Sequence, residues 1–161
     1  MTDADLRRLV DGTGATPPDL VQWVDRDGID LRDRRWFVML RQGPRTMVLR
    51  HRRGRCVYLG PDDRCTAYES RPIGCRVFPL DPEFSARGTL RRLDLIEATE
   101  CPYAMDGSND IDTLRALHQR YDAENDAYLE KAATWNRLQR ARQRQGKKPE
   151  TGPRFLEFLG F

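Results

Sequence analysis

The chain has 161 residues, of which 39% are hydrophobic and 33% are charged, a composition that predicts one soluble globular domain. It contains no apolar run of roughly eighteen residues, which excludes a membrane-spanning helix. The net charge of +3, from 28 basic and 25 acidic residues, is too small to predict a nucleic-acid partner.

Two short helices are expected at the start of the chain. Thr2 and Asp5 fit a capping box, which predicts a helix that ends at the glycines Gly12 and Gly14. The run Thr16-Pro17-Pro18 predicts the start of a second helix, which would end at Gly28. Its expected buried side consists of Leu20, Val21 and Val24.

Strand-like runs follow. Residues 35–42 and 46–51 are rich in apolar residues, and the turn signal Gly43-Pro44-Arg45 between them predicts an antiparallel hairpin. Residues 55–59 predict a short third strand, which would carry Cys56.

Breaker residues dominate residues 60–82, which are therefore expected to form a loop region. Residues 90–96 predict another strand, or an extended connection to Cys101. A bound metal is a sensible organiser for a segment with so few residues that can pack.

The C-terminal part is expected to be helical. Apolar residues at steps of three, four and seven predict a long helix at about 110–144. The tail, residues 149–161, ends in Phe-Leu-Gly-Phe and should dock on the domain or on a partner. We therefore predict a single α+β domain over residues 1–161 with its core in 1–105: a small antiparallel sheet, packed helices and a loop-rich metal site.

A basic run lies near the end of the long helix. Residues 137–148 contain Arg137, Arg140, Arg142, Arg144, Lys147 and Lys148 and no acidic residue. The run fits a solvated helix end, where cations suit the helix dipole, or a surface that binds phosphate or an acidic protein or peptide partner.

The four cysteines lie close together in the sequence, at Cys56, Cys65, Cys75 and Cys101. The first residues lack the basic and apolar regions of a signal peptide, so we expect a cytoplasmic protein, in which disulfides are rare. Four thiolates complete a tetrahedral Zn²⁺ site or hold one [4Fe–4S] cluster. Independent buried thiols and a redox pair are the other interpretations.

The spacing of the cysteines favours the [4Fe–4S] cluster over Zn²⁺. Eight, nine and 25 residues separate successive cysteines, and no Cys-x2-Cys pair occurs. Each ligand would come from its own loop, and a cube has four separate irons that each take one cysteine.

Arginines accompany the cysteines at Arg55, Arg64, Arg71 and Arg76. Their guanidinium groups would offset the negative charge of a four-thiolate centre, so we expect them around the cofactor, although arginine is also simply common here. Pro72 predicts one helical turn at 73–76, with N–H groups near Cys75. His51 is a candidate fifth ligand, but an ordinary role is the simpler interpretation for it and for His118.

One string resembles a known family: Cys56, eight residues, Cys65-Thr-Ala-Tyr-Glu-Ser-Arg71-Pro72-Ile-Gly-Cys75-Arg76-Val-Phe-Pro79. It resembles the core motif of the YkgJ-type cysteine-cluster proteins, described as zinc- or iron-chelating domains, and of the related flagellin lysine-N-methylase. Family members carry a Cys-x2-Cys-x2-Cys-Cys group ahead of this segment, and Met1 stands where that group should already have passed. The chain either keeps a four-cysteine site or begins late.

Three functions stay open. The first is a [4Fe–4S] protein of structural, redox or sensory role. The second, implied by the resemblance alone, is a cluster-dependent enzyme that modifies a protein or peptide, such as a lysine N-methyltransferase; the chain has no glycine-rich S-adenosylmethionine loop and no assigned catalytic residue. The third is a zinc-stabilised module that binds a protein or peptide partner through the tail or the basic helix end.

Overall fold

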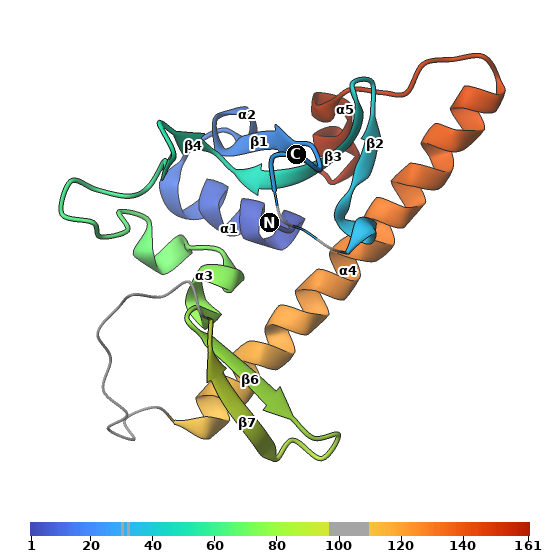
Figure 1. Cartoon of the computed structure of the whole chain (residues 1–161). Coiled ribbons are helices and arrows are strands. Elements are labelled where there is room, and N and C mark those ends of the chain that lie inside the picture. Colours follow the sequence, from blue (N-terminus) through green and yellow to red (C-terminus); the bar gives the residue numbers. More distant parts are fainter. Residues whose placement is uncertain (30, 32, 97–109) are drawn as a thin grey trace.

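The computed structural model describes residues 1–29, 31, 33–96 and 110–161, which form helices and small antiparallel sheets (Figure 1). The helices are α1 (Asp3–Thr13), α2 (Pro17–Leu20), α3 (Ile73–Val77), α4 (Ile111–Arg144) and α5 (Gly152–Phe158), with the 3-10 turns η1 (Arg34–Trp36) and η2 (Tyr68–Ser70). The strands are β1 (Val21–Val24), β2 (Val38–Leu40), β3 (Gly43–Leu49), β4 (His51–Arg52), β5 (Arg55–Cys56), β6 (Leu80–Phe84) and β7 (Leu90–Leu95). The fold is α+β, as predicted.

The main sheet has the strand order β1-β3-β2 and is antiparallel throughout. Its strand β1 corrects the prediction of a helix that continues to Gly28. Helix α2 ends at Leu20, and Val21 then pairs with Leu49 of β3. β-Branched and aromatic side chains such as Val21, Trp23 and Val24 suit a pleated strand better than a helix, and the pairing with β3 decides the outcome.

The hairpin β2–β3 also differs from the prediction in where it turns. Leu40 pairs directly with Gly43, so the turn residues are Arg41 and Gln42, and Gly43-Pro44-Arg45 belongs to strand β3. Gly43 has a φ of +101°, a conformation that glycine adopts without strain. β1 pairs with residues 46–49 only, so the missing N–H of Pro44 interrupts no hydrogen bond to β1.

Helix α1 begins with the predicted capping box. The Asp5 N–H donates to Thr2 Oγ1 at 3.1 Å, and the Thr2 N–H donates to Asp5 Oδ2 at 2.9 Å. The helix ends at Gly14, whose φ is +69°. Thr2 and Asp5 are buried, so the start of α1 lies in the interior of the protein.

Two small hairpins complete the strands. β4 and β5 pair just before the expected loop region, and the strand predicted at 55–59 is limited to Arg55–Cys56. β6 pairs with β7, so the chain leaves the loop region at Leu80 rather than after Pro82. The predicted strand at 90–96 is confirmed as β7, whereas β6 lacked a local signal because its pairing partner lies beyond a turn.

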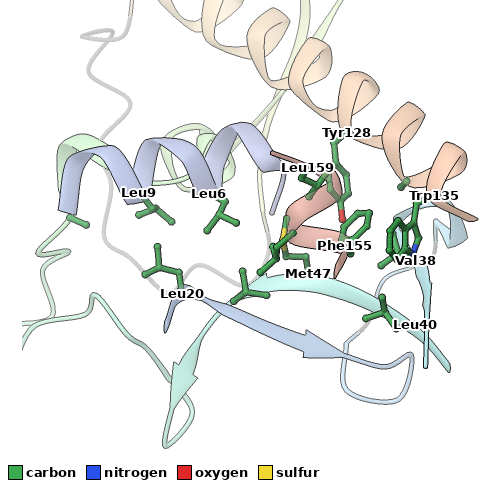
Figure 2. Packing of buried hydrophobic residues seen from close by; sticks show 14 residues of the cluster. Leu6, Leu9, Leu20, Val38, Leu40, Met47, Tyr128, Trp135, Phe155 and Leu159 are labelled. Atoms are coloured by element: carbon green, nitrogen blue, oxygen red, sulfur yellow. The ribbon is translucent and has the colours of Figure 1, made fainter. Parts of the chain in front are cut away.

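The hydrophobic core lies between α1, the main sheet, α4 and α5 (Figure 2). Leu6 and Leu9 of α1 point toward Leu20 and the sheet, and Phe155 of α5 is fully buried against Trp135 of α4. Of the two predicted docking places, the domain itself or a partner, the tail occupies its own domain.

Helix α4 runs along the whole molecule, from the β6–β7 hairpin to the main sheet (Figure 1). Asp110 caps it, with Oδ2 accepting the Thr113 N–H at 3.1 Å, so the predicted long helix is confirmed. Two of its apolar residues, Ile111 and Leu138, are exposed. In the described part of the chain, no helix combines the length and apolar character needed to cross a membrane.

Candidate metal centre

The structure places three of the four cysteines on separate elements. Cys56 ends strand β5, and Cys75 lies inside helix α3. The backbone of Cys65 forms an isolated β-bridge with that of Leu59. All three are free thiols. Cys101 lies outside the described residues, so the convergence of all four cysteines stays a prediction.

Cys56 and Cys75 line the same cavity, which has a volume of about 330 Å³. The two residues are 19 positions apart, yet β5 and α3 bring them to one space. The polar residues Asp5, His51, Tyr121 and Asn125 also line this cavity. Tyr121 brings helix α4 into the wall of this cavity.

Cys65 lines a neighbouring surface hollow together with Arg64, Tyr68 and Arg71. Cys65 is nevertheless close enough to influence Cys75 in the first cavity. Partial burial raises the pKa of the Cys75 thiol, and the charges of Cys56, Asp5 and Cys65 raise that pKa further, while Arg71 lowers it. Cys56 and Cys65 are therefore close enough to oppose the ionisation of Cys75, which a bound cation would reverse.

The donors in this region fit zinc or iron in kind. Thiolate sulfur and imidazole nitrogen are the protein ligands that both metals take. Within the described ranges, no three His, Cys, Asp or Glu side chains already form a metal-binding group. Cys56 and Cys75 thus line one cavity without forming a metal-binding group with a third donor, and Cys101 lies outside those ranges.

A tight hairpin positions Cys56. The turn residues Arg53 and Gly54 have φ values of +51° and +78°, which is typical of the type I′ turn that joins two twisted strands. His51 of β4 is the direct cross-strand partner of Cys56. The sequence makes His51 a candidate ligand, but it contains no signal that His51 faces Cys56 across a hairpin.

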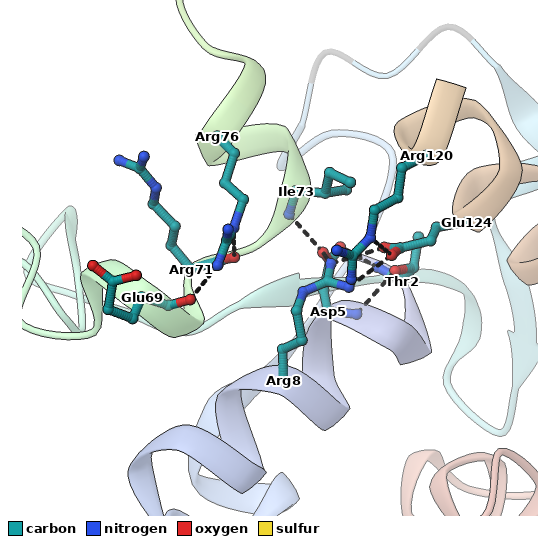
Figure 3. A network of polar contacts seen from close by, with 9 residues as sticks. All are labelled: Thr2, Asp5, Arg8, Glu69, Arg71, Ile73, Arg76, Arg120 and Glu124. Carbon is teal, nitrogen blue, oxygen red and sulfur yellow. Dashed lines mark hydrogen bonds and ion pairs between the residues drawn. The ribbon is translucent and has the colours of Figure 1, made fainter. Parts of the chain in front are cut away.

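Asp5 positions the segment that carries Cys75 (Figure 3). Its Oδ1 accepts the N–H of Ile73, the first residue of α3, at 2.7 Å. The same carboxylate closes the capping box of α1 and pairs with Arg8. One buried side chain therefore joins the start of α1 to the start of α3, 68 residues further along the chain.

Glu124 of α4 extends this network. It accepts hydrogen bonds from Arg8 Nη1 at 2.7 Å and from Arg120 Nε at 2.7 Å. Burial alone would raise the pKa of Glu124, but these hydrogen bonds outweigh it and lower the pKa. The network of Asp5, Arg8 and Glu124 thus ties α1, α3 and α4 together beside the cavity.

Helix α1 also lies directly against η2, which precedes the Cys75 segment. A Cβ atom added at Gly12 would lie 1.7 Å from Ser70 Oγ and 2.7 Å from Ser70 Cβ. Gly12 is therefore required for this close approach, although it lies within a helix. The pattern of glycines predicted a helix end here and missed this contact.

The four arginines singled out from the sequence occupy different settings. Arg55 forms an ion pair with Asp63 at the surface, and Arg64 lines the hollow beside Cys65. The Arg71 guanidinium lies 3.7 Å from the centre of the Tyr68 ring, and of the four it is the one whose charge lowers the pKa of Cys75.

Arg76 acts within its own loop. Its Nε donates to the carbonyl oxygen of Arg71 at 3.3 Å, and its Nη2 donates to the carbonyl oxygen of Glu69. It therefore links α3 to η2 (Figure 3). The expectation that all four arginines surround a cofactor stays a prediction.

The comparisons with known proteins point to a family. A family model named CxxCxxCC and described as "Putative zinc- or iron-chelating domain" matches residues 16–102, more than half of the chain. The match covers Cys56, Cys65, Cys75 and Cys101, and it agrees with the resemblance seen in the motif. No curated protein and no solved structure matches the chain.

Proposed function

The chain belongs to the CxxCxxCC family of zinc- or iron-chelating domains, and we propose that its four cysteines hold one metal centre in the cytoplasm. The observation that carries this proposal is the shared cavity of Cys56 and Cys75. Two thiols that reach one space from separate elements suit a common ligand better than two independent packing roles.

The charges around Cys75 support the proposal. Each neighbouring anion makes a free Cys75 thiolate less favourable, and a metal ion removes that cost by compensating all the charges at once. Cys56, Cys65 and Cys75 would hold the centre, with Cys101 as the fourth ligand.

We propose a [4Fe–4S] cluster as the centre, with Zn²⁺ as the alternative. The wide spacing of the cysteines favours the cluster, because each iron takes one separate thiolate. The cluster would supply a one-electron redox couple, a sensing group or a structural cross-link. The protein's own part is to hold the ligands: the tight hairpin fixes Cys56, and Asp5 fixes the turn that carries Cys75.

Metal analysis of protein prepared without oxygen tests this proposal. We expect a brown protein with about four iron and four acid-labile sulfide per chain. Cys75→Ser should lose the colour and the iron, whereas Ser70→Ala, in the adjacent turn, should keep both. One zinc per chain without sulfide would replace the cluster by the zinc alternative, and a metal-free protein that does not take up either metal would overturn the proposal.

A second candidate function, binding of an acidic peptide or protein, is favoured by an arginine-lined surface at the end of α4. Arg137, Arg140 and Arg144 line one hollow there. Arg140 also lines an adjacent hollow of about 230 Å³ together with Arg26 and Arg34. The apolar residues Phe37 and Met39 line this hollow as well. The tail is packed into the core, which leaves the helix end as the surface for such a partner.

A labelled acidic peptide tests this second candidate. Arg140→Glu should weaken its binding about tenfold or more, because the change reverses a charge shared by both hollows. Arg91→Glu, on exposed strand β7, is the control for net charge. Equal binding by the two variants, or binding of duplex DNA in preference to the peptide, would exclude an acidic partner at this surface.

A further inference from the structure

His51 faces Cys56 across the β4–β5 hairpin. The two residues are directly opposed in the antiparallel register, so their side chains leave the same face of the hairpin. Cβ atoms of such pairs lie about 4.5–5.5 Å apart, which is within reach of a shared metal ion. His51 also lines the cavity that Cys56 and Cys75 share.

The His51 ring is already oriented by a backbone group. Its Nδ1 lies 2.9 Å from the carbonyl oxygen of Leu49. A carbonyl oxygen only accepts hydrogen bonds, so Nδ1 carries the proton and Nε2 carries the free lone pair. Metal-bound histidines commonly donate the other ring N–H to a carbonyl oxygen, which fixes the tautomer and the ring.

The backbone of His51 is fixed as well. Its N–H donates to Gln22 Oε1 of strand β1 at 3.1 Å, which anchors β4 to the main sheet. The imidazole is therefore attached to a supported strand rather than to a free loop. That support lowers the entropy lost when the ring is ordered on a ligand.

His118, the other histidine of the chain, has a different setting. Its ring stacks on Tyr121 with centroids 6.2 Å apart and lies 5.7 Å from the Phe84 ring. Its Nε2 lies 3.6 Å from Asp122 Oδ2. His118 is held by packing on α4, so it serves as an internal control for His51.

We propose that Nε2 of His51 is a ligand of the metal centre beside the Cys56 sulfur, a fifth protein donor that would raise the coordination number of the metal ion held by Cys56. This inference rests on the proposed metal centre and adds a nitrogen donor to it. Four features of the described residues support it: the cross-strand register, the shared cavity, the Nδ1 tautomer and the anchored strand.

Nitrogen NMR of the imidazole rings tests the proposal directly. Zn²⁺ is added without oxygen to reduced, metal-free protein, and the His118→Gln variant assigns the signals, since the chain has two histidines. We expect the Nε2 signal of His51 to shift on metal binding and Nδ1 to stay protonated, while the His118 signals stay in place. In the iron-loaded protein, reduced to its paramagnetic state, pulsed electron paramagnetic resonance should detect the coupling of one imidazole nitrogen.

Variants give a second measurement. His51→Gln should weaken Zn²⁺ affinity by about tenfold or more, the scale on which even residues behind the ligands act. Circular dichroism should stay unchanged, because His51 is exposed. His118→Gln should keep the wild-type affinity. If wild-type protein binds metal while the His51 signals stay unshifted, or if both variants bind equally well, the ligand role is wrong and the metal centre stands. Failure to bind metal at all would overturn both.

Discussion

Asp5 Oδ1 lies 2.7 Å from the backbone nitrogen of Ile73, and this contact fixes the position of the turn that carries Cys75. Asp5 is buried and accepts hydrogen bonds from α1, from Arg8 and from α3. The position of Cys75 therefore depends on a carboxylate that lies 70 residues before it in the chain.

Replacing Asp5 by alanine should destabilise the protein by about 3 kcal/mol, because the Ile73 N–H loses its partner and the partly buried Arg8 charge keeps only Glu124. Urea denaturation measures the change in the free energy of unfolding. Asp11→Ala is the matched control: Asp11 is exposed on the same helix and should change stability by about 0.5 kcal/mol or less. Equal effects of the two changes would show that the Asp5 contacts contribute little.

Replacing Gly12 by alanine should destabilise the protein by up to about 2 kcal/mol. Alanine favours a helix over glycine by about 1 kcal/mol, but the overlap of its Cβ with Ser70 costs about 1–3 kcal/mol and displaces η2. The double variant Gly12→Ala/Ser70→Gly should recover most of the loss, as a double-mutant cycle measures. A stabilising Gly12→Ala change would contradict this close contact.

Tyr128 should make the protein less stable at alkaline pH. Its side chain is fully buried, burial raises its pKa well above the usual range, and its hydroxyl has no hydrogen-bond partner among the described residues. Above about pH 10 the unfolded chain releases this proton and the folded chain keeps it. This one group therefore lowers the free energy of unfolding by about 1.4 kcal/mol per pH unit in that range.

Tyr128→Phe should remove this alkaline term and leave stability at pH 7 unchanged or slightly higher, because the lost hydroxyl is unpaired. Denaturation between pH 8 and about pH 11.5 compares the two proteins across the pKa of an unfolded tyrosine. Tyr68→Phe, at an exposed position, controls for the removal of a tyrosine. Parallel pH profiles for wild type and Tyr128→Phe would refute the explanation.

The docked tail should contribute a large part of the stability. Phe155→Ala opens a cavity beside Trp135 and Tyr128 and should cost about 3–5 kcal/mol. Phe158→Ala, in the same helix but 38% exposed, should cost much less. Thermal melts of both variants check this difference, and similar losses would mean that α5 acts through its helix rather than through the buried ring.

Local signals predicted the parts of the fold that depend on neighbouring residues. The capping box at Thr2 and Asp5, the apolar period of α4 and the apolar tail all appear in short stretches of sequence. Strand β1 was missed because Val21 is extended through its pairing with Leu49, a contact between residues 28 positions apart. No local pattern contains that pairing.

The sequence predicts candidate ligands but not the side chains that support them. The number of cysteines and the expected reducing compartment predict a metal centre. The contact of Asp5 with Ile73, the close approach of Gly12 to Ser70 and the opposition of His51 and Cys56 arise only when separate elements pack. The local sequence around Asp5 predicts a capping box, but it does not predict the hydrogen bond to a segment 68 residues away.

The two halves of helix α4 differ in burial, and their amides should therefore differ in the rate of hydrogen exchange. Its 34 residues extend about 50 Å, at about 1.5 Å per residue. Leu114 is the one residue described as buried in the first half, whereas Tyr128, Leu129, Ala132, Trp135 and Gln139 are buried in the second. Amides of the first half should therefore open at a lower free energy than those packed on the main sheet.

Helix α3 packs against α4, and its Gly74 lies next to Tyr121 in that weaker half. A metal held by Cys75 would thus slow amide exchange around Tyr121 far more than around Trp135.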